Sequence, residues 1–173
     1  AEAPAALLGR NGLHRVDGQV VASVGAYPGR QADLSSAEAI LVVDVDPAET
    51  APVMDLRIRR MADRKLAKIA VIGSVLPRYR GRHARMQLRP SQTAAALRSL
   101  AAVVAGGKAP KSEFDPEALT QMAALFTGGK RVAIVWGGEN AETGRALLEL
   151  AAALKTAGNP VSILVPGAQN NSR

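Results

Sequence analysis

Two acidic residues, Asp44 and Asp46, stand directly after the apolar run Ile40–Val43. Carboxylates at positions i and i+2 at the end of a strand share one face, where one can act as a general acid and the other as a general base. Asp46 precedes Pro47, however, and this order is more typical of a turn or a helix cap. We therefore predict no catalytic residue and treat the pair as part of a candidate binding site.

Small residues follow the other apolar runs in the same way. Ligands of open parallel sheets bind at the carboxyl ends of the strands, where small loops let backbone amides approach a phosphate. Glycine can equally serve only to turn the chain between strand and helix. The candidate cofactor-binding residues, each of which closely follows an apolar run, are Asp44, Asp46, Pro47, Gly73, Ser74, Gly137, Gly138, Pro166 and Gly167.

Several other kinds of site are excluded or disfavoured. The sequence has no cysteine, which excludes thiolate zinc sites, iron-sulfur clusters and a cysteine nucleophile within the chain. No GxGxxG motif follows an apolar run, and the Gly-Lys pairs at 107–108 and 129–130 lack the other residues of a P-loop. His14 and His83 are far apart in the sequence. We therefore expect neither a metal ion nor a bound cofactor in this chain.

The chain is basic, with a formal net charge of +7. Eleven of its 22 Lys and Arg lie between Arg57 and Arg89, where Asp63 is the only acidic residue. A basic surface attracts polyanions, but Tyr79 is the only aromatic residue available there for base stacking. A basic nucleic-acid-binding module is therefore an alternative, with weak binding and no sequence preference, and docking against an acidic protein surface or plain solvation is favoured.

Four apolar runs are continuous rather than alternating, which is typical of strands covered on both faces of a parallel sheet. These runs are Ile40–Val43, Ile69–Ile72, Val132–Trp136 and Val161–Val165. No apolar run reaches the ~20 residues that span a bilayer, so we expect no direct membrane insertion.

Segments with helical periodicity lie between these runs. The pattern predicts helices from Thr50 to about Lys65, from Ser91 as N-cap to Gly106, from Asp115 as N-cap to Gly128, and from Asn140 to Gly158. The alternation predicts an α/β, Rossmann-like three-layer fold with a mostly parallel sheet of at least four strands. We expect an irregular lead-in over residues 1–35 and one domain over 36–173, with a flexible connection near 105–112.

The order of motifs has a counterpart in a known family. In Ala37–Gly73, a strand ends in an Asp-Pro turn, a Glu lies shortly before a Pro, and an arginine-rich helix leads into the next strand. This order resembles the molybdopterin oxidoreductase superfamily. Leu88–Thr93 is similar to the family segment that ends in a Pro-Gly-Thr-Asp turn, and Val161–Arg173 resembles the strand that leads into its Asn-containing loop. The resemblance starts near Asp33 and implies a fragment of a larger chain.

Within this superfamily the likeness is strongest to the G subunit of bacterial NADH-quinone oxidoreductase, respiratory complex I. The resemblance implies a structural and docking domain whose partners are other domains of its own parent chain and other subunits of the complex. The parent would transfer electrons from NADH to quinone through iron-sulfur clusters in a part that this chain lacks. The chain would be cytoplasmic and would lie at the inner face of the plasma membrane through the parent complex.

Two departures from the family pattern concern the cofactor. Active members commonly carry Asp-Pro-Arg after the second strand, where this chain has Gly73–Val75, and Pro-Gly-Thr-Asp where it has Pro90–Thr93. The acidic groups lost at these places would accept hydrogen bonds from the amino groups of a pterin or guanine. The resemblance therefore implies a vestigial crevice. The alternative is the molybdopterin guanine dinucleotide-binding domain of an active molybdenum enzyme, such as a formate dehydrogenase or nitrate reductase.

Overall fold

The computed structural model describes residues 26–108, 113–138 and 140–166. Within them lies one sheet of five strands in the order β3-β2-β1-β4-β5, with every pair of neighbours parallel. The strands are β1 (Ala39–Val43), β2 (Lys68–Gly73), β3 (Arg82–Gln87), β4 (Val132–Trp136) and β5 (Val161–Leu164). The helices are α2 (Gln31–Ser36), α3 (Pro47–Thr50), α4 (Pro52–Asp63), α5 (Thr93–Val104), α6 (Pro116–Ala124) and α7 (Ala141–Thr156). The Rossmann-like prediction is confirmed.

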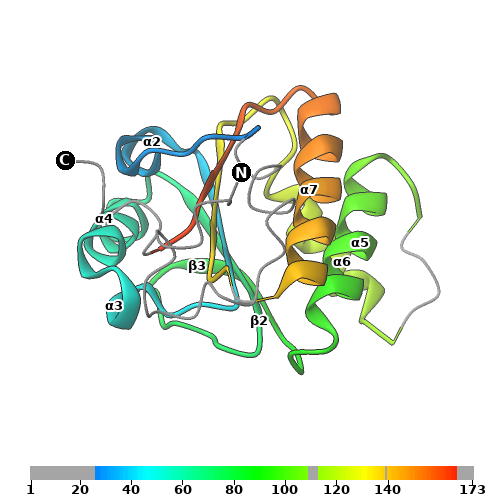
Figure 1. Cartoon of the computed structure of the whole chain (residues 1–173). Coiled ribbons are helices and arrows are strands. Elements are labelled where there is room, and N and C mark those ends of the chain that lie inside the picture. Colours follow the sequence, from blue (N-terminus) through cyan, green and yellow to red (C-terminus); the bar gives the residue numbers. More distant parts are fainter. Residues whose placement is uncertain (1–25, 109–112, 139, 167–173) are drawn as a thin grey trace, which may run out of the picture.

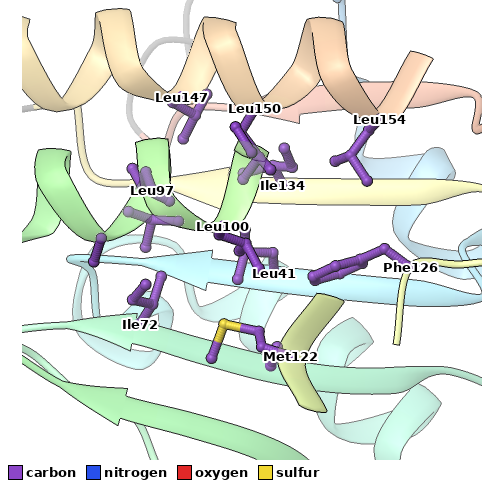
Figure 2. Close-up of a cluster of buried hydrophobic side chains, with 14 of the residues drawn as sticks. Leu41, Ile72, Leu97, Leu100, Met122, Phe126, Ile134, Leu147, Leu150 and Leu154 are labelled. Carbon is purple, nitrogen blue, oxygen red and sulfur yellow. The ribbon is translucent and has the colours of Figure 1, made fainter. Parts of the chain in front are cut away.

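Helices cover both faces of the sheet, which gives three layers (Figure 1). On one face, Leu34 of α2 and Ile58 of α4 belong to a cluster with the side chains of β1 and β2 that point to their side. On the other face, α5, α6 and α7 pack in a larger cluster that includes Leu97, Phe126 and Leu150 (Figure 2). The buried strand residues therefore divide between two cores, because side chains alternate between the two faces along a strand.

The central strands β1 and β4 are the most completely covered part of the sheet. Every residue of both strands is buried, with exposed fractions between 0% and 2%. They pair directly with each other, from Ala39 opposite Val132 to Val43 opposite Trp136. The prediction that continuous aliphatic runs mark strands covered on both faces is confirmed for these two strands.

The edge strand β3 was not predicted, because only Met86 of its six residues is an apolar side chain buried in the core. The eight residues 74–81 connect β2 to β3 without a helix, although parallel strands are usually joined by a dozen or more residues. The register between these strands shifts at Ile69, whose backbone N–H donates to Nδ1 of His83 over 3.2 Å instead. A basic stretch that looked like one loop is therefore part loop and part strand.

The helix boundaries follow most of the predicted capping residues. Oδ1 of Asp115 accepts a hydrogen bond from the Glu117 backbone N–H, and Oδ1 of Asn140 accepts from the first turn of α7. The prediction of Ser91 as the N-cap of α5 is wrong, because Gln92 occupies that position and makes no side-chain capping bond.

The segment before the first strand also has structure. Helix α2 was not predicted, and Pro28 forms a parallel bridge to Ile163 of β5. Of the predicted lead-in, residues 1–25 lie outside the described residues, as do 109–112 of the predicted flexible connection. None of the described helices is long and apolar enough to cross a membrane.

Candidate functional site

The strand order places a topological switch point between β1 and β4. The chain steps from β1 to β2 and β3 toward one edge of the sheet, and then returns to β4 on the other side of β1. The connection after β1 leads to α3 and α4 on one face, whereas the connection after β4 leads to α7 on the opposite face (Figure 1). Ligands of open α/β sheets bind outside the carboxyl ends of the strands at such a point. The candidate residues that follow β1 and β4 flank this position.

Asp44 joins the carboxyl ends of β1 and β2. Its backbone N–H donates to the Ile72 carbonyl oxygen over 3.1 Å. Its Oδ1 accepts two hydrogen bonds from Ser74, from the backbone N–H at 2.6 Å and from the hydroxyl at 3.0 Å. The backbone φ of Asp44 is 47°, a left-handed conformation that short polar residues tolerate. One oxygen of this carboxylate is therefore engaged within the protein, and the Ser74 hydroxyl is turned toward it.

Glycine is required at two neighbouring positions because the backbones approach closely there. Gly73 has a φ of 133°, and a Cβ atom at this position would collide with the Asp44 carboxylate. A Cβ at Gly137 would lie 2.7 Å from the Asp44 carbonyl oxygen. The structure therefore gathers Asp44, Gly73, Ser74 and Gly137 into one group. Packing against Asp44 is a sufficient reason for both glycines, without any ligand.

Asp46 has a different role from Asp44. Its Oδ1 accepts a hydrogen bond from the Ala48 backbone N–H over 2.9 Å and caps α3, with Pro47 buried at the first helical position. The favoured interpretation of Asp46 before Pro47, a helix cap, agrees with this geometry. The two carboxylates thus make separate local contacts, and no hydrogen bond among the described residues links one to the other.

The remaining candidates are less closely connected to this group. Gly138 is buried with a φ of 78°, and Pro166 is half-buried after β5. No hydrogen bond among the described residues ties either of them to Asp44. Gly167 lies outside the described residues. Within the described part of the chain, no three His, Asp or Glu side chains are grouped as metal ligands would be.

A buried polar cluster lies on the α4 side of the sheet and was not predicted. Asp55 of α4 is buried, and its Oδ2 accepts a hydrogen bond from Nε of Arg59 over 2.5 Å. The Arg59 guanidinium lies 5.4 Å from the centre of the Tyr79 ring. Burial, and next the Asp55 charge, raise the pKa of the Tyr79 hydroxyl far above its ordinary value. Asp55 and Arg59 are one helical turn apart on α4, and the tertiary structure adds Tyr79, so the cluster anchors the loop 74–81 to this helix.

The family model for molybdopterin oxidoreductases matches residues 10–170, nearly the whole chain. The chain belongs to the molybdopterin oxidoreductase family. The superfamily resemblance inferred from Ala37–Gly73 is thereby confirmed, whereas the more specific likeness to a complex I subunit is a separate question. No curated protein matches this chain significantly.

One solved structure with a similar fold is a chain of the formyltransferase/hydrolase complex from Methylorubrum extorquens, determined in complex with methylofuran. The two folds superpose with a TM-score of 0.63 at 18% sequence identity. The match covers 85% of this chain and 41% of the other, so this chain spans less than half the length of that relative. At this level of identity the likeness supports the three-layer fold and nothing more specific.

The geometry does not fit a family pterin dinucleotide at the two positions where the sequence departs from the family pattern. The Ser74 hydroxyl donates to Asp44, and Oε1 of Gln92 accepts from the Arg89 backbone N–H over 3.0 Å. Ser74 and Gln92 are the neighbours of Gly73 and Thr93, which stand where the family pattern has its two Asp residues. Neither these neighbours nor Gly73 and Thr93 offer a carboxylate acceptor to a pterin or guanine.

We predict that GDP, which carries the distal half of such a cofactor, binds poorly. A buried donor without its acceptor costs about 1–3 kcal/mol, so two such losses weaken binding by roughly a hundredfold or more. In calorimetric titration we expect a dissociation constant weaker than about 100 μM, equivalent to less than about 6 kcal/mol of binding free energy. A low-micromolar constant that is lost in a correctly folded Asp46→Ala variant would show that the crevice still binds nucleotides.

Proposed function

We propose that this chain acts as a structural and docking domain of a larger molybdopterin-oxidoreductase-like protein and catalyses no reaction by itself. The observation that carries this proposal is the outer surface of α4. The described residues include four exposed large hydrophobic side chains, and three of them, Val53, Leu56 and Leu66, border one groove of about 450 Å³. We call it the α4 groove, and its lining residues are Ser35, Val53, Leu56, Arg57, Arg60, Met61, Arg64 and Leu66.

The apolar residues of the α4 groove favour burial against a partner. Val53, Leu56 and Leu66 are 55%, 65% and 56% exposed, although each could bury most of its surface in an interface. Complete burial of one such side chain contributes about 1.5–3 kcal/mol, so covering the exposed parts of all three would contribute a few kcal/mol. Single exposed apolar side chains need no explanation, but a group of them beside one groove is typical of an interaction site.

The charged residues of the α4 groove indicate the chemistry of the partner. Arg57 and Arg60 of α4 and Arg64 at its C-cap recur at helical spacing. Nη1 of Arg57 donates to the Ser35 hydroxyl over 3.1 Å, which holds this guanidinium at the groove. None of the three is ion-paired with a carboxylate anywhere in the described ranges. An acidic amphipathic segment, with apolar anchors flanked by Asp or Glu, would match both the apolar and the basic parts of this surface.

The absence of catalysis in this proposal rests on the state of the candidate acids. Asp44 accepts two hydrogen bonds from Ser74, and Asp46 caps a helix. One oxygen of each carboxylate is taken up by these local contacts, and no hydrogen bond among the described residues joins the two as an acid/base pair. The lack of a carboxylate at Gly73 and Thr93, where the family pattern has Asp, likewise argues against the alternative of an active molybdenum enzyme.

The parent protein is proposed from the resemblance stated above. The motif order in Ala37–Gly73 supports the superfamily, and within it we propose the G subunit of a bacterial NADH-quinone oxidoreductase. Its partners would be other domains of the parent chain and other complex I subunits at the cytoplasmic face of the membrane. The fold match to a chain of the formyltransferase/hydrolase complex, at 18% identity, supports the shared fold and does not decide the parent. Cysteine-rich, ferredoxin-like segments in the complete parent sequence would support a redox parent, either complex I or an active molybdenum enzyme, and their absence would favour the nucleic-acid-binding alternative.

We expect a synthetic helical peptide with leucines at i, i+3 and i+7 and flanking glutamates to bind the α4 groove. Fluorescence anisotropy would measure binding to the wild-type chain and to a Leu56→Asp variant. The introduced carboxylate removes an apolar contact and repels the acidic peptide, so we expect the affinity to fall at least tenfold, by about 1.4 kcal/mol or more. Leu56 is 65% exposed, and its replacement should change the stability of the fold by less than about 0.5 kcal/mol.

The matched control is Val75→Asp, because Val75 is the fourth exposed large hydrophobic residue and lies outside the α4 groove. This variant should bind the peptide as the wild type does. Equal binding of a scrambled peptide, or equal loss in both variants, would contradict the docking proposal. Binding to vesicles of anionic lipid but not to the peptide would contradict it as well and would identify a membrane surface as the partner.

A further inference from the structure

A second basic hollow lies at the outer edge of the sheet, away from the α4 groove. It has a volume of about 520 Å³ and is lined by Leu76, Arg78, Arg85 and Gln87, which we call the edge hollow. Arg78 and Leu76 come from the loop 74–81, whereas Arg85 and Gln87 come from β3. In the sheet, β2 and β1 separate β3 from the switch point between β1 and β4. None of the four lining residues is among the candidate cofactor-binding residues, although Gln87 lies beside Gly73 in the sheet.

The strand register explains why the two β3 side chains face the same hollow. Arg85 lies opposite Val71 and Gln87 opposite Gly73 in the pairing of β3 with β2. Residues at i and i+2 of a strand point to the same face of the sheet. Val71 belongs to the core cluster on the α4 side, and Leu76 packs against this same cluster. The loop and alternate side chains of the edge strand thus meet on one face.

The loop side of the edge hollow is held in place by the polar cluster on α4. Tyr79, the residue after Arg78, is buried with an exposed fraction of 4%. Nη1 of Arg59 donates to the Arg78 carbonyl oxygen over 3.3 Å, and the Arg59 guanidinium also contacts the Tyr79 ring. Arg59 therefore holds both the Arg78 carbonyl and the neighbouring Tyr79 ring. A binding site that is ordered before its ligand arrives loses less conformational entropy on binding.

The charges of the edge hollow are unbalanced. No hydrogen bond or ion pair is made by the Arg78 or Arg85 guanidinium within the described residues. The residues that line the hollow include no carboxylate. Two guanidiniums that line one hollow repel each other. An anion between them would reduce this repulsion and would accept a charge-assisted hydrogen bond from each. Arginine is suited to such contacts because its planar group donates two parallel hydrogen bonds to a phosphate or a carboxylate.

We propose that the edge hollow binds a small organic polyanion through its phosphate or carboxylate groups. Arg78 and Arg85 bind the oxyanions, the Gln87 amide donates a further hydrogen bond, and Leu76 contacts the apolar part of the ligand. The volume of about 520 Å³ falls within the range of about 300–1,000 Å³ found for small-molecule sites. A ligand with two or more oxyanionic groups matches this size and the two separate guanidiniums.

Isothermal titration calorimetry with inorganic pyrophosphate and, separately, with citrate tests the proposal. The two probes distinguish a phosphate ligand from a carboxylate ligand. We expect at least one of them to bind with a dissociation constant below about 1 mM, the equivalent of about 4 kcal/mol. Arg85→Gln should weaken binding about tenfold or more, because a contact with a charged group is lost. Arg78→Lys keeps the charge but loses the paired hydrogen bonds, and should weaken binding several-fold.

The matched control is Arg80→Gln, because Arg80 is an exposed arginine of the same loop that does not line the edge hollow. It changes the net charge as Arg85→Gln does and should leave the affinity within about twofold, about 0.4 kcal/mol. Equal weakening in both variants would show non-specific attraction to the basic surface and would overturn the proposal, as would no binding of either probe at 10 mM in about 50 mM salt. Leu56→Asp should not affect this binding, so the edge hollow and the docking proposal can fail independently.

Discussion

Replacing Gly73 with alanine is expected to lower the free energy of unfolding by about 2–4 kcal/mol. The φ of 133° is strained for any residue with a Cβ atom, and the added Cβ would collide with the Asp44 carboxylate that binds Ser74. Neither residue can move freely, because Asp44 also donates its backbone N–H to Ile72. Urea denaturation followed by circular dichroism would measure the effect, with the midpoint and the slope compared between the two proteins.

Gly128→Ala is the matched control for this prediction. Gly128 also has a positive φ, 92°, but a Cβ there would meet nothing within 4 Å. Its replacement therefore reports backbone strain without a collision, and should cost about 1–2 kcal/mol. A Gly73→Ala variant as stable as Gly128→Ala would show that the close contact with Asp44 is not a constraint. In a double-mutant cycle, Asp44→Ala should offset part of the cost of Gly73→Ala because the collision is removed.

Replacing Trp136 with alanine is expected to lower the free energy of unfolding by about 3–5 kcal/mol. Trp136 is 2% exposed, pairs with Val43 in the centre of the sheet and belongs to the larger core cluster. The variant loses the transfer free energy of a large aromatic side chain and leaves a cavity that the surrounding backbone cannot close. For a chain of this size we expect the melting temperature to fall by about 10 °C.

Thermal unfolding followed by far-ultraviolet circular dichroism measures this change, because the sequence has no second tryptophan to report by fluorescence. Trp136→Phe keeps an aromatic ring in the core and should cost about half as much. Leu56→Ala, at a position that is 65% exposed, should shift the melting temperature by no more than about 1–2 °C. A loss below about 1.5 kcal/mol in Trp136→Ala would mean that the end of β4 is not part of the rigid core.

The sequence could predict which residues follow the strands at the carboxyl edge of the sheet. It could not predict which of these residues contact one another. Asp44, Gly73 and Gly137 each follow a continuous apolar run, and the carboxyl ends of parallel strands lie at one edge of the sheet. The order of the strands decides which of these residues meet. Because β2 lies beside β1, Gly73 and Ser74 contact Asp44 directly. Pro166 follows β5, which β4 separates from β1.

Local sequence patterns were sufficient to predict several helices and strands. Strands β1 and β4 are continuous aliphatic runs, and Asp115 and Asn140 cap their helices through bonds to residues two positions away. Such signals depend on the periodicity of side chains and on neighbouring backbone groups, so they can be recognised in the sequence alone.

Which distant residues share a surface depends on the arrangement of the strands and helices. β3 becomes a strand because β2 offers it backbone hydrogen bonds, although its side chains show no apolar run. Arg78 and Arg85 meet at one hollow because the loop 74–81 is anchored to α4 by Arg59. The exposed side of α4 likewise depends on where α2 and the sheet lie. The physical reason is that contacts across strands and helices are set by the order and register of the sheet, whereas the local pattern of the chain fixes only which segments can join it.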